Sequence, residues 1–150
     1  MKNIILITFL FFIHSCGYTS VYKNSNNQDY KMVITEMSGD RELNNLIKNQ
    51  INLYSNNNSL NIFNLIVKTK FEKLVLSKEK TGSVANYELT ANSEFIISFG
   101  EKSKTTAFTE TININKKTDT FEQDLYEKNI KRNFASSIRE KLISEIATLK

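Results

Sequence analysis

The residue types that carry most enzyme and metal chemistry are scarce in this sequence. It contains one cysteine (Cys16), one histidine (His14), no proline and no tryptophan in 150 residues. A single cysteine excludes an intrachain disulfide, so packing alone must stabilise the fold. Thiolate and imidazole groups supply most zinc sites and most nucleophile–base pairs. We therefore expect no enzyme, no cofactor and no metal site.

Neither sign of charge dominates the chain. Its 20 Lys and Arg residues and 16 Asp and Glu residues give a formal net charge of +4, and the basic residues are spread along the sequence. Nucleic-acid-binding domains usually concentrate a larger positive charge on one face. We therefore expect no nucleic-acid partner.

One long apolar run stands at the start of the chain. Residues 4–13 are apolar apart from Thr8, and Lys2 precedes them. This order of a charged and an apolar region is typical of a secretory signal peptide. The run is well short of the ~20 residues that cross a bilayer as a helix. We expect residues 1–15 to be removed rather than retained as a transmembrane anchor.

The apolar run ends at residues 13–16 (Ile-His-Ser-Cys), which resemble a bacterial lipobox. The resemblance implies that Cys16 is the lipidation site and the first residue of the mature protein, with residues 16–29 as the lipidated N-terminus and linker. A single acyl chain anchors a protein only marginally, whereas the two or three chains of a bacterial lipoprotein hold it firmly. Gly17 after the cysteine resembles the signal of lipoproteins exported to the outer membrane.

Residues 30–150 read as a single α+β domain. Alternation and helical spacing predict a strand over 30–36, a helix over 41–54, a strand from residue 62, a strand ending at 99, a strand ending near 114, and a helix from 119 to the C-terminus. The order is β-α-β-β-β-α. It predicts two helices packed on one face of a four-stranded mixed sheet, with the first strand parallel to a later one because a helix separates them.

The apolar patterns make three finer predictions. The strand ending at 99 alternates so regularly that Phe95 is expected inside and Glu94 outside. In the strand from residue 62, the apolar phase changes between Phe71 and Leu74, which predicts a β-bulge near residues 72–73. The last helix, capped by Asp119, carries one apolar stripe. That stripe consists of Phe121, Leu125, Ile130, Phe134, Ile138, Leu142, Ile146 and Leu149.

Three motifs occur in order behind the lipobox. They are residues 16–18 (Cys-Gly-Tyr), 39–44 (Gly-Asp-Arg-Glu-Leu-Asn) and 81–89 (Thr-Gly-Ser-Val-Ala-Asn-Tyr-Glu-Leu). Together with the order of elements, they resemble the lipopolysaccharide-assembly lipoprotein LptE family in its alphaproteobacterial form. The resemblance implies a non-enzymatic protein on the periplasmic side of the outer membrane. There it would plug the lumen of the LptD β-barrel one-to-one, help that barrel assemble and help lipopolysaccharide reach the outer leaflet.

Two groups of residues are candidates for this role. The ammonium groups of five lysines are candidate contacts for lipopolysaccharide phosphates, although lysines on exposed strands also prevent edge-to-edge aggregation. These residues are Lys68, Lys70, Lys73, Lys78 and Lys80. The turn formed by Thr81, Gly82 and Ser83 is a candidate partner contact, although glycine is also an ordinary turn residue.

A lipid- or ligand-binding lipoprotein of another envelope pathway is the alternative function. A large apolar cavity would favour such a carrier. A filled core with a polar outer sheet face would favour the plug, since the lumens of such barrels are polar. The Asn, Ser and Thr residues expected on the outer face fit a polar lumen and an ordinary solvated surface equally well.

Overall fold

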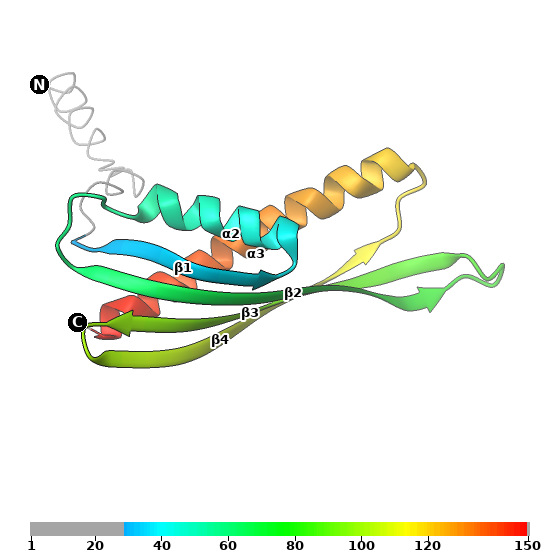
Figure 1. Ribbon diagram of the computed structural model, residues 1–150. Helices are drawn as coiled ribbons and strands as arrows, with labels where there is room; N and C mark the ends of the chain where they lie inside the picture. The colour runs from blue at the N-terminus through cyan, green and yellow to red at the C-terminus, as the bar shows by residue number, and fades with distance from the viewer. Residues whose placement is uncertain (1–28, 150) are drawn as a thin grey trace, which may run out of the picture.

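The computed structural model describes residues 29–149. The elements in chain order are β1 (Lys31–Gly39), α2 (Arg41–Tyr54), β2 (Ile62–Lys78), β3 (Val84–Phe99), β4 (Lys102–Asn115) and α3 (Thr120–Leu149) (Figure 1). This is the predicted order. The predictions of a signal peptide over residues 1–15 and of lipidation at Cys16 lie outside the described residues.

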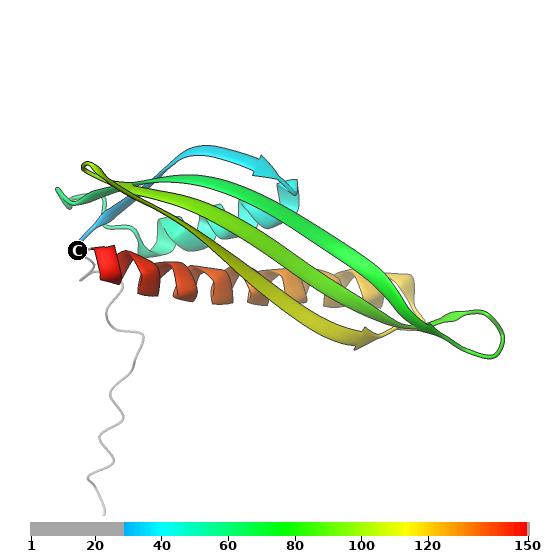
Figure 2. The same ribbon diagram turned by 90° about the horizontal axis from the view of Figure 1, so that it is seen from below.

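The strands form one mixed sheet in the order β1-β2-β3-β4. β1 pairs with β2 in parallel, and the other two pairings are antiparallel. α2 makes the crossover between the two parallel strands, as such a connection requires. Both helices lie on the same face of the sheet (Figures 1 and 2), and they pack against each other. The predicted architecture is confirmed.

Both helices begin at an aspartate cap. The Oδ1 atom of Asp40 accepts a hydrogen bond from the backbone N–H of Leu43 at 2.8 Å, and that of Asp119 accepts one from Glu122 at 2.9 Å. A carboxylate at this position satisfies one of the free N–H groups of the first turn and favourably meets the positive end of the helix dipole. α2 consequently spans the predicted residues.

The hydrophobic core lies between the two helices and the inner face of the sheet. β3 alternates as predicted, with Phe95 fully buried and Glu94 exposed. Phe63 stacks on Phe99 with ring centroids 4.5 Å apart. The largest fully buried side chains are those of Phe63, Phe95, Leu43, Ile47, Ile51, Leu65, Leu89, Ile97, Ile138, Leu142, Ile146 and Val67.

The predicted β-bulge near residues 72–73 is wrong. The β2–β3 register runs without a break from Asn64 to Val75 and shifts only on either side of Ser77. The apolar residues shift from odd-numbered to even-numbered positions because the residues packed against the strand change. The strand itself is regular here. Beyond Phe71, Lys73 faces α3, and Leu74 points away from the helices and is 54% exposed.

The apolar stripe of α3 is confirmed only in part. Its buried portion begins at Ile130 and continues through Ile146, whereas Phe121 is 75% exposed and Leu125 is 49% exposed. Figure 1 shows why: the first turns of α3 diverge from the sheet. Within residues 29–149, no helix combines the length and the apolar character that crossing a bilayer requires.

Substitutions at Phe95 and Glu94 test which face of β3 points into the core. Phe95→Ala should lower the free energy of unfolding by ~3–5 kcal/mol, because it leaves a cavity in the core. Glu94→Ala should change it by less than ~0.5 kcal/mol, because that side chain is exposed. Urea unfolding of the two variants measures both values. Equal losses would mean that the inner and outer faces of β3 are assigned wrongly.

Gly39 lets the end of β1 lie very close to the backbone of β2. Its φ angle is +102°, and a Cβ atom at this position would lie 1.8 Å from the carbonyl oxygen of Thr69. Gly39→Ala should therefore cost at least ~3 kcal/mol, since strain and overpacking add. Gly82→Ala is the control: its φ is +86° but the space around it is open, so ~1–2 kcal/mol is expected. Thermal unfolding that ranks Gly82→Ala as the worse variant would contradict this packing.

Candidate functional site

The structure separates the five candidate lysines into three places. Lys68 and Lys70 project from the outer face of β2, Lys73 lies on the face that carries the helices, and Lys78 and Lys80 lie where the hairpin turns. A strand rises ~3.3 Å per residue, so Lys70 and Lys78 are about 26 Å apart along β2. One phosphate group therefore cannot contact all of these side chains.

Lys73 joins the sheet to α3. Its ammonium group forms an ion pair with Glu127, which also accepts a hydrogen bond from Gln123. The same Nζ atom lies 4.2 Å from the ring centroid of Tyr87. Lys73 therefore has partners within the domain.

A shallow hollow of about 190 Å³ lies on the outer face of the sheet. Lys68 and Lys70 border it, together with Asn92, Glu94 and Thr109 from β3 and β4. Lys70 forms an exposed ion pair with Glu72 at 2.8 Å, and such pairs contribute only ~0–1 kcal/mol. The hollow is smaller than the ~300 Å³ at which ligand pockets begin. It presents ammonium groups beside the Glu94 carboxylate and neutral hydrogen-bonding groups, and it does not enclose a ligand.

The predicted turn at residues 81–83 forms the tip of the β2–β3 hairpin. The backbone N–H of Glu79 donates to the carbonyl oxygen of Ser83 at 2.8 Å, and that of Gly82 donates to Glu79 at 2.9 Å. Thr81, Gly82 and Ser83 are all exposed. Figure 2 shows the hairpin projecting past the other strands and past α3. No other part of the described domain therefore covers the tip.

Several large hydrophobic side chains are exposed in the half of the molecule that leads to the tip. They are Leu74 (54%), Val75 (49%), Leu76 (48%), Ile112 (39%), Phe121 (75%), Leu125 (49%) and Tyr126 (38%), and are called here the distal apolar residues. The sequence interpretation missed them, although the phase change after Phe71 and the wider spacing between Leu125 and Ile130 were signals of them.

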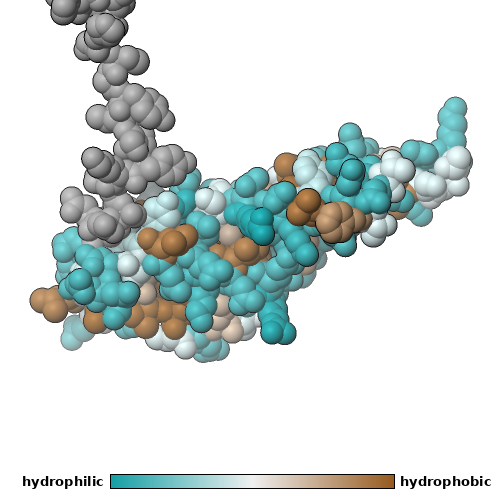
Figure 3. All heavy atoms as spheres, turned by 90° about the horizontal axis from the view of Figure 1, so that it is seen from above, coloured by the Kyte–Doolittle hydropathy of each residue, from teal (hydrophilic) through white to brown (hydrophobic). Residues whose placement is uncertain are grey.

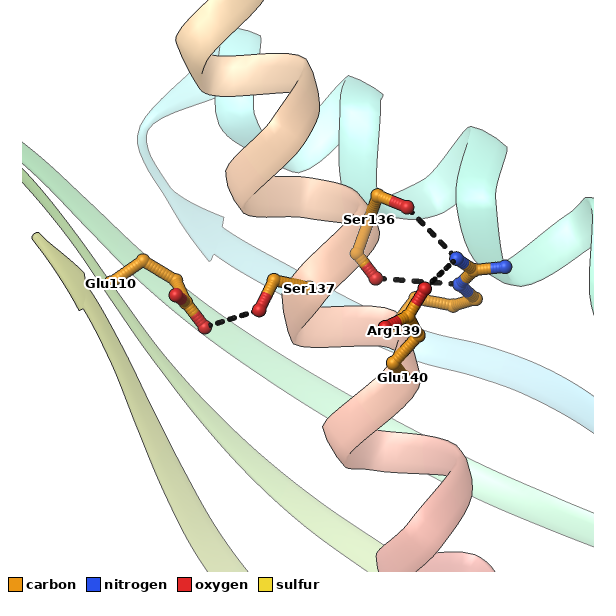
Figure 4. Close-up of polar contacts among 5 residues, drawn as sticks. All are labelled: Glu110, Ser136, Ser137, Arg139 and Glu140. Carbon is orange, nitrogen blue, oxygen red and sulfur yellow. Dashed lines mark hydrogen bonds and ion pairs between the residues drawn. The ribbon is translucent and has the colours of Figure 1, made fainter. Parts of the chain in front are cut away.

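Polar contacts hold α3 against the edge strand β4 (Figure 4). The carboxylate of Glu110 accepts a hydrogen bond from Ser137 at 2.8 Å and pairs with Lys141 at 2.6 Å. Arg139 donates to the Ser136 hydroxyl at 2.8 Å and pairs with Glu140 at 2.9 Å. The Glu110 contacts join α3 to β4, whereas those of Arg139 lie within α3. The Arg139 side chain is buried, and its guanidinium group lies 3.9 Å from the ring centroid of Tyr54 in α2.

Between residues 29 and 149, no three His, Cys, Asp or Glu side chains gather where they could hold a metal ion. Burial raises the pKa of the Tyr30 phenol above its ordinary value of 10.0. The phenol is therefore neutral at physiological pH, and its ring packs edge-on against Phe63.

The fold is similar to solved structures of bacterial lipoproteins. The sequence matches no protein-family model and no curated protein. Rare lipoprotein B from Shewanella oneidensis superposes with a TM-score of 0.58 at 21% identity, over 79% of this chain and 98% of that one. A minor lipoprotein from Acinetobacter baumannii gives a TM-score of 0.52 at 14% identity, over 77% of this chain and 94% of that one. At these identities the likeness establishes the fold.

Proposed function

We propose that this chain is a lipid-anchored protein of the bacterial outer membrane that plugs an LptD-type β-barrel. In a one-to-one complex it would help the barrel assemble and help lipopolysaccharide reach the outer leaflet. The observation that carries the proposal is the projecting β2–β3 hairpin, with exposed Leu74, Val75 and Leu76 on the part of β2 that leads to its tip. Such side chains are typical of surfaces that a partner covers.

The hairpin has the rigidity that insertion into a partner requires. β2 and β3 are 17 and 16 residues long and stay paired from Asn64 to Val75 without a break. A long two-stranded ribbon alone in water is marginally stable, but here the covered half of the sheet supports it. Three of the distal apolar residues, Leu74, Val75 and Leu76, therefore project from a strand pair that is already folded before a partner binds, while the other four lie on β4 and α3.

The outer face of the sheet has the chemistry of a surface that meets a polar lumen. The hydroxyls of Thr90 and Thr111 lie 3.3 Å apart, and Thr109 donates to Asn92 at 2.7 Å. Neutral side chains that hydrogen-bond one another lose less on leaving water than unpaired charges do. Since barrel interiors are polar, this face suits contact with a barrel wall.

Two lines of comparison point to the same class of protein. Residues 13–16 resemble a lipobox, and the solved structures with a similar fold are described as lipoproteins. The motifs at residues 16–18, 39–44 and 81–89 resemble the LptE family in particular. Together they support an envelope lipoprotein, and the hairpin favours a plug among such proteins.

A carrier of lipids or other ligands is the second candidate, and the packing disfavours it. Phe63, Phe95 and Leu142 are fully buried in the space between helices and sheet. A second surface hollow, about 440 Å³ at the base of the tip, is lined mostly by polar residues, among them Glu79, Lys116 and Lys117. Acyl chains require apolar walls, which this hollow does not supply.

Lysine charge on the outer face and at the hairpin end should govern lipopolysaccharide binding. Replacing Lys68, Lys70 and Lys78 with Glu should abolish binding to lipopolysaccharide with little change in melting temperature, because these side chains are exposed. Lys73→Glu is the matched control: it should lower the melting temperature, because it places two carboxylates together at Glu127. If the triple variant binds lipopolysaccharide as well as the native protein does at low salt, where charge effects are largest, these lysines serve solubility and not lipopolysaccharide binding.

The tip should be required for the complex with the barrel. Gly82→Arg should lower severalfold the amount of barrel that co-purifies with the protein from mildly solubilised outer membranes, because it adds bulk and charge at the contact. Gly100→Arg is the matched control, since Gly100 also has positive φ and open space but lies in the turn at the opposite end. Recovery of the native protein as a free monomer would contradict the plug and favour the carrier.

A further inference from the structure

A second group of exposed hydrophobic side chains lies at the end of the molecule opposite the tip. Leu53 at the end of α2 is 66% exposed, Leu60 in the following loop is 96% exposed, and Ile62 at the start of β2 is 44% exposed. We call these three residues the proximal apolar residues. Figure 3 shows hydrophobic residues projecting from this end of the surface.

The loop that carries Leu60 is ordered by its own hydrogen bonds. The side chain of Asn56 accepts from the backbone N–H of Asn58 at 3.0 Å, and the hydroxyl of Ser59 accepts from Asn61 at 3.1 Å. These contacts fold the polar residues back onto the backbone. The loop therefore presents its leucine outward in a defined conformation.

The described chain begins beside this loop. The side-chain amide of Asn61 donates to the backbone carbonyl of Asp29 at 2.9 Å, and the N–H of Lys31 donates to the carbonyl of Asn61 at 2.8 Å. The N–H of Asn56 donates to the carbonyl of Tyr30 at 3.1 Å. The segment that leads back to Cys16 therefore leaves the domain next to Leu60.

Chain length keeps this end near the lipid anchor. Cys16 precedes Tyr30 by 14 residues, and that many residues cannot span more than about 50 Å. Figure 1 shows the start of β1, the loop before β2, and the β3–β4 turn at one end, with the hairpin tip at the other. An anchor in a bilayer thus keeps the proximal apolar residues within about 50 Å of lipid, whereas the tip lies farther from the anchor by the length of the domain.

We propose that the proximal apolar residues insert into the interfacial region of the bilayer that holds the lipidated N-terminus. This inference rests on the lipid anchor of the proposed function. Charges at this end are balanced, with Asp29 and Glu101 against Lys31 and Lys102, so apolar burial rather than attraction to anionic lipids drives the contact. The contact orients the domain with its β2–β3 tip pointing away from the anchored leaflet.

A single tryptophan tests this contact, because the chain contains none. The full mature protein carrying Leu60→Trp is reconstituted into vesicles of phosphatidylethanolamine and phosphatidylglycerol, with or without bromine on the acyl chains. Brominated lipid should quench its emission at least severalfold more than that of Leu76→Trp, a distal control with a 48% exposed parent residue. Added salt should leave the quenching unchanged, because the contact is apolar.

Intact-mass measurement of the same samples distinguishes the ways in which this inference fails. If Cys16 is acylated but brominated lipid quenches both variants equally, the membrane contact is overturned and the anchor stands. A blue-shifted but unquenched emission from Leu60→Trp would assign the loop to a protein contact, such as a second copy, and would also overturn the membrane contact. An unacylated Cys16 would overturn the anchor and this inference together.

Discussion

The unbroken antiparallel pairing of β2 with β3 is the interaction on which the other features depend. It runs from Asn64 and Ser98 to Val75 and Tyr87 with no change of register. Over the first part of this length the helices cover the inner face, and the odd-numbered side chains of both strands are buried. Beyond Val75 the two strands continue past α3 to the tip, with register shifts on either side of Ser77. One hairpin therefore serves as the floor of a core and as a projecting arm.

The attachment of α3 shows which forces hold the covered half together. Ion pairs link α3 to neighbouring elements, such as Lys104 with Glu145 and Lys131 with Glu42. Each partly exposed pair contributes only ~0–1 kcal/mol. Burial of one side chain such as Ile138 or Leu142 contributes ~1.5–3 kcal/mol. Apolar packing therefore sets most of the stability, and the ion pairs add contacts from α3 to β4 and to α2.

The molecule has two ends with different chemistry, and the proposed roles follow that division. The distal end carries a glycine turn on a projecting hairpin and exposed apolar side chains on β2, β4 and α3, which suits contact with a large protein partner. The proximal end carries the first described residues and Leu60, which suits contact with the membrane of the anchor. The sheet between them is long enough to keep both contacts apart. A tethered plug requires this polarity, because its anchor and its partner surface must be engaged together.

Local features of the fold were readable from the sequence because their causes lie within a few residues. Asp40 and Asp119 cap helices through their own neighbours, and the alternation of β3 follows from the pleat. The order of elements then implied the mixed sheet. The alternation of side chains along β2 also implied that Lys73 and Lys70 lie on opposite faces of the sheet, since successive side chains point to opposite faces.

The extent of helix cover was decided only by the tertiary structure. An apolar phase change after Phe71 arises equally from a bulge and from a strand whose apolar cover ends, and only the pairing with β3 and the position of α3 distinguish them. For the same reason Phe121 and Leu125 read as core and proved exposed. The sequence by itself determined which segments are helices and strands, since short-range contacts set these. Which apolar side chains remain uncovered depends on contacts between segments some fifty residues apart, such as Lys73 with Glu127, and local periodicity does not encode them.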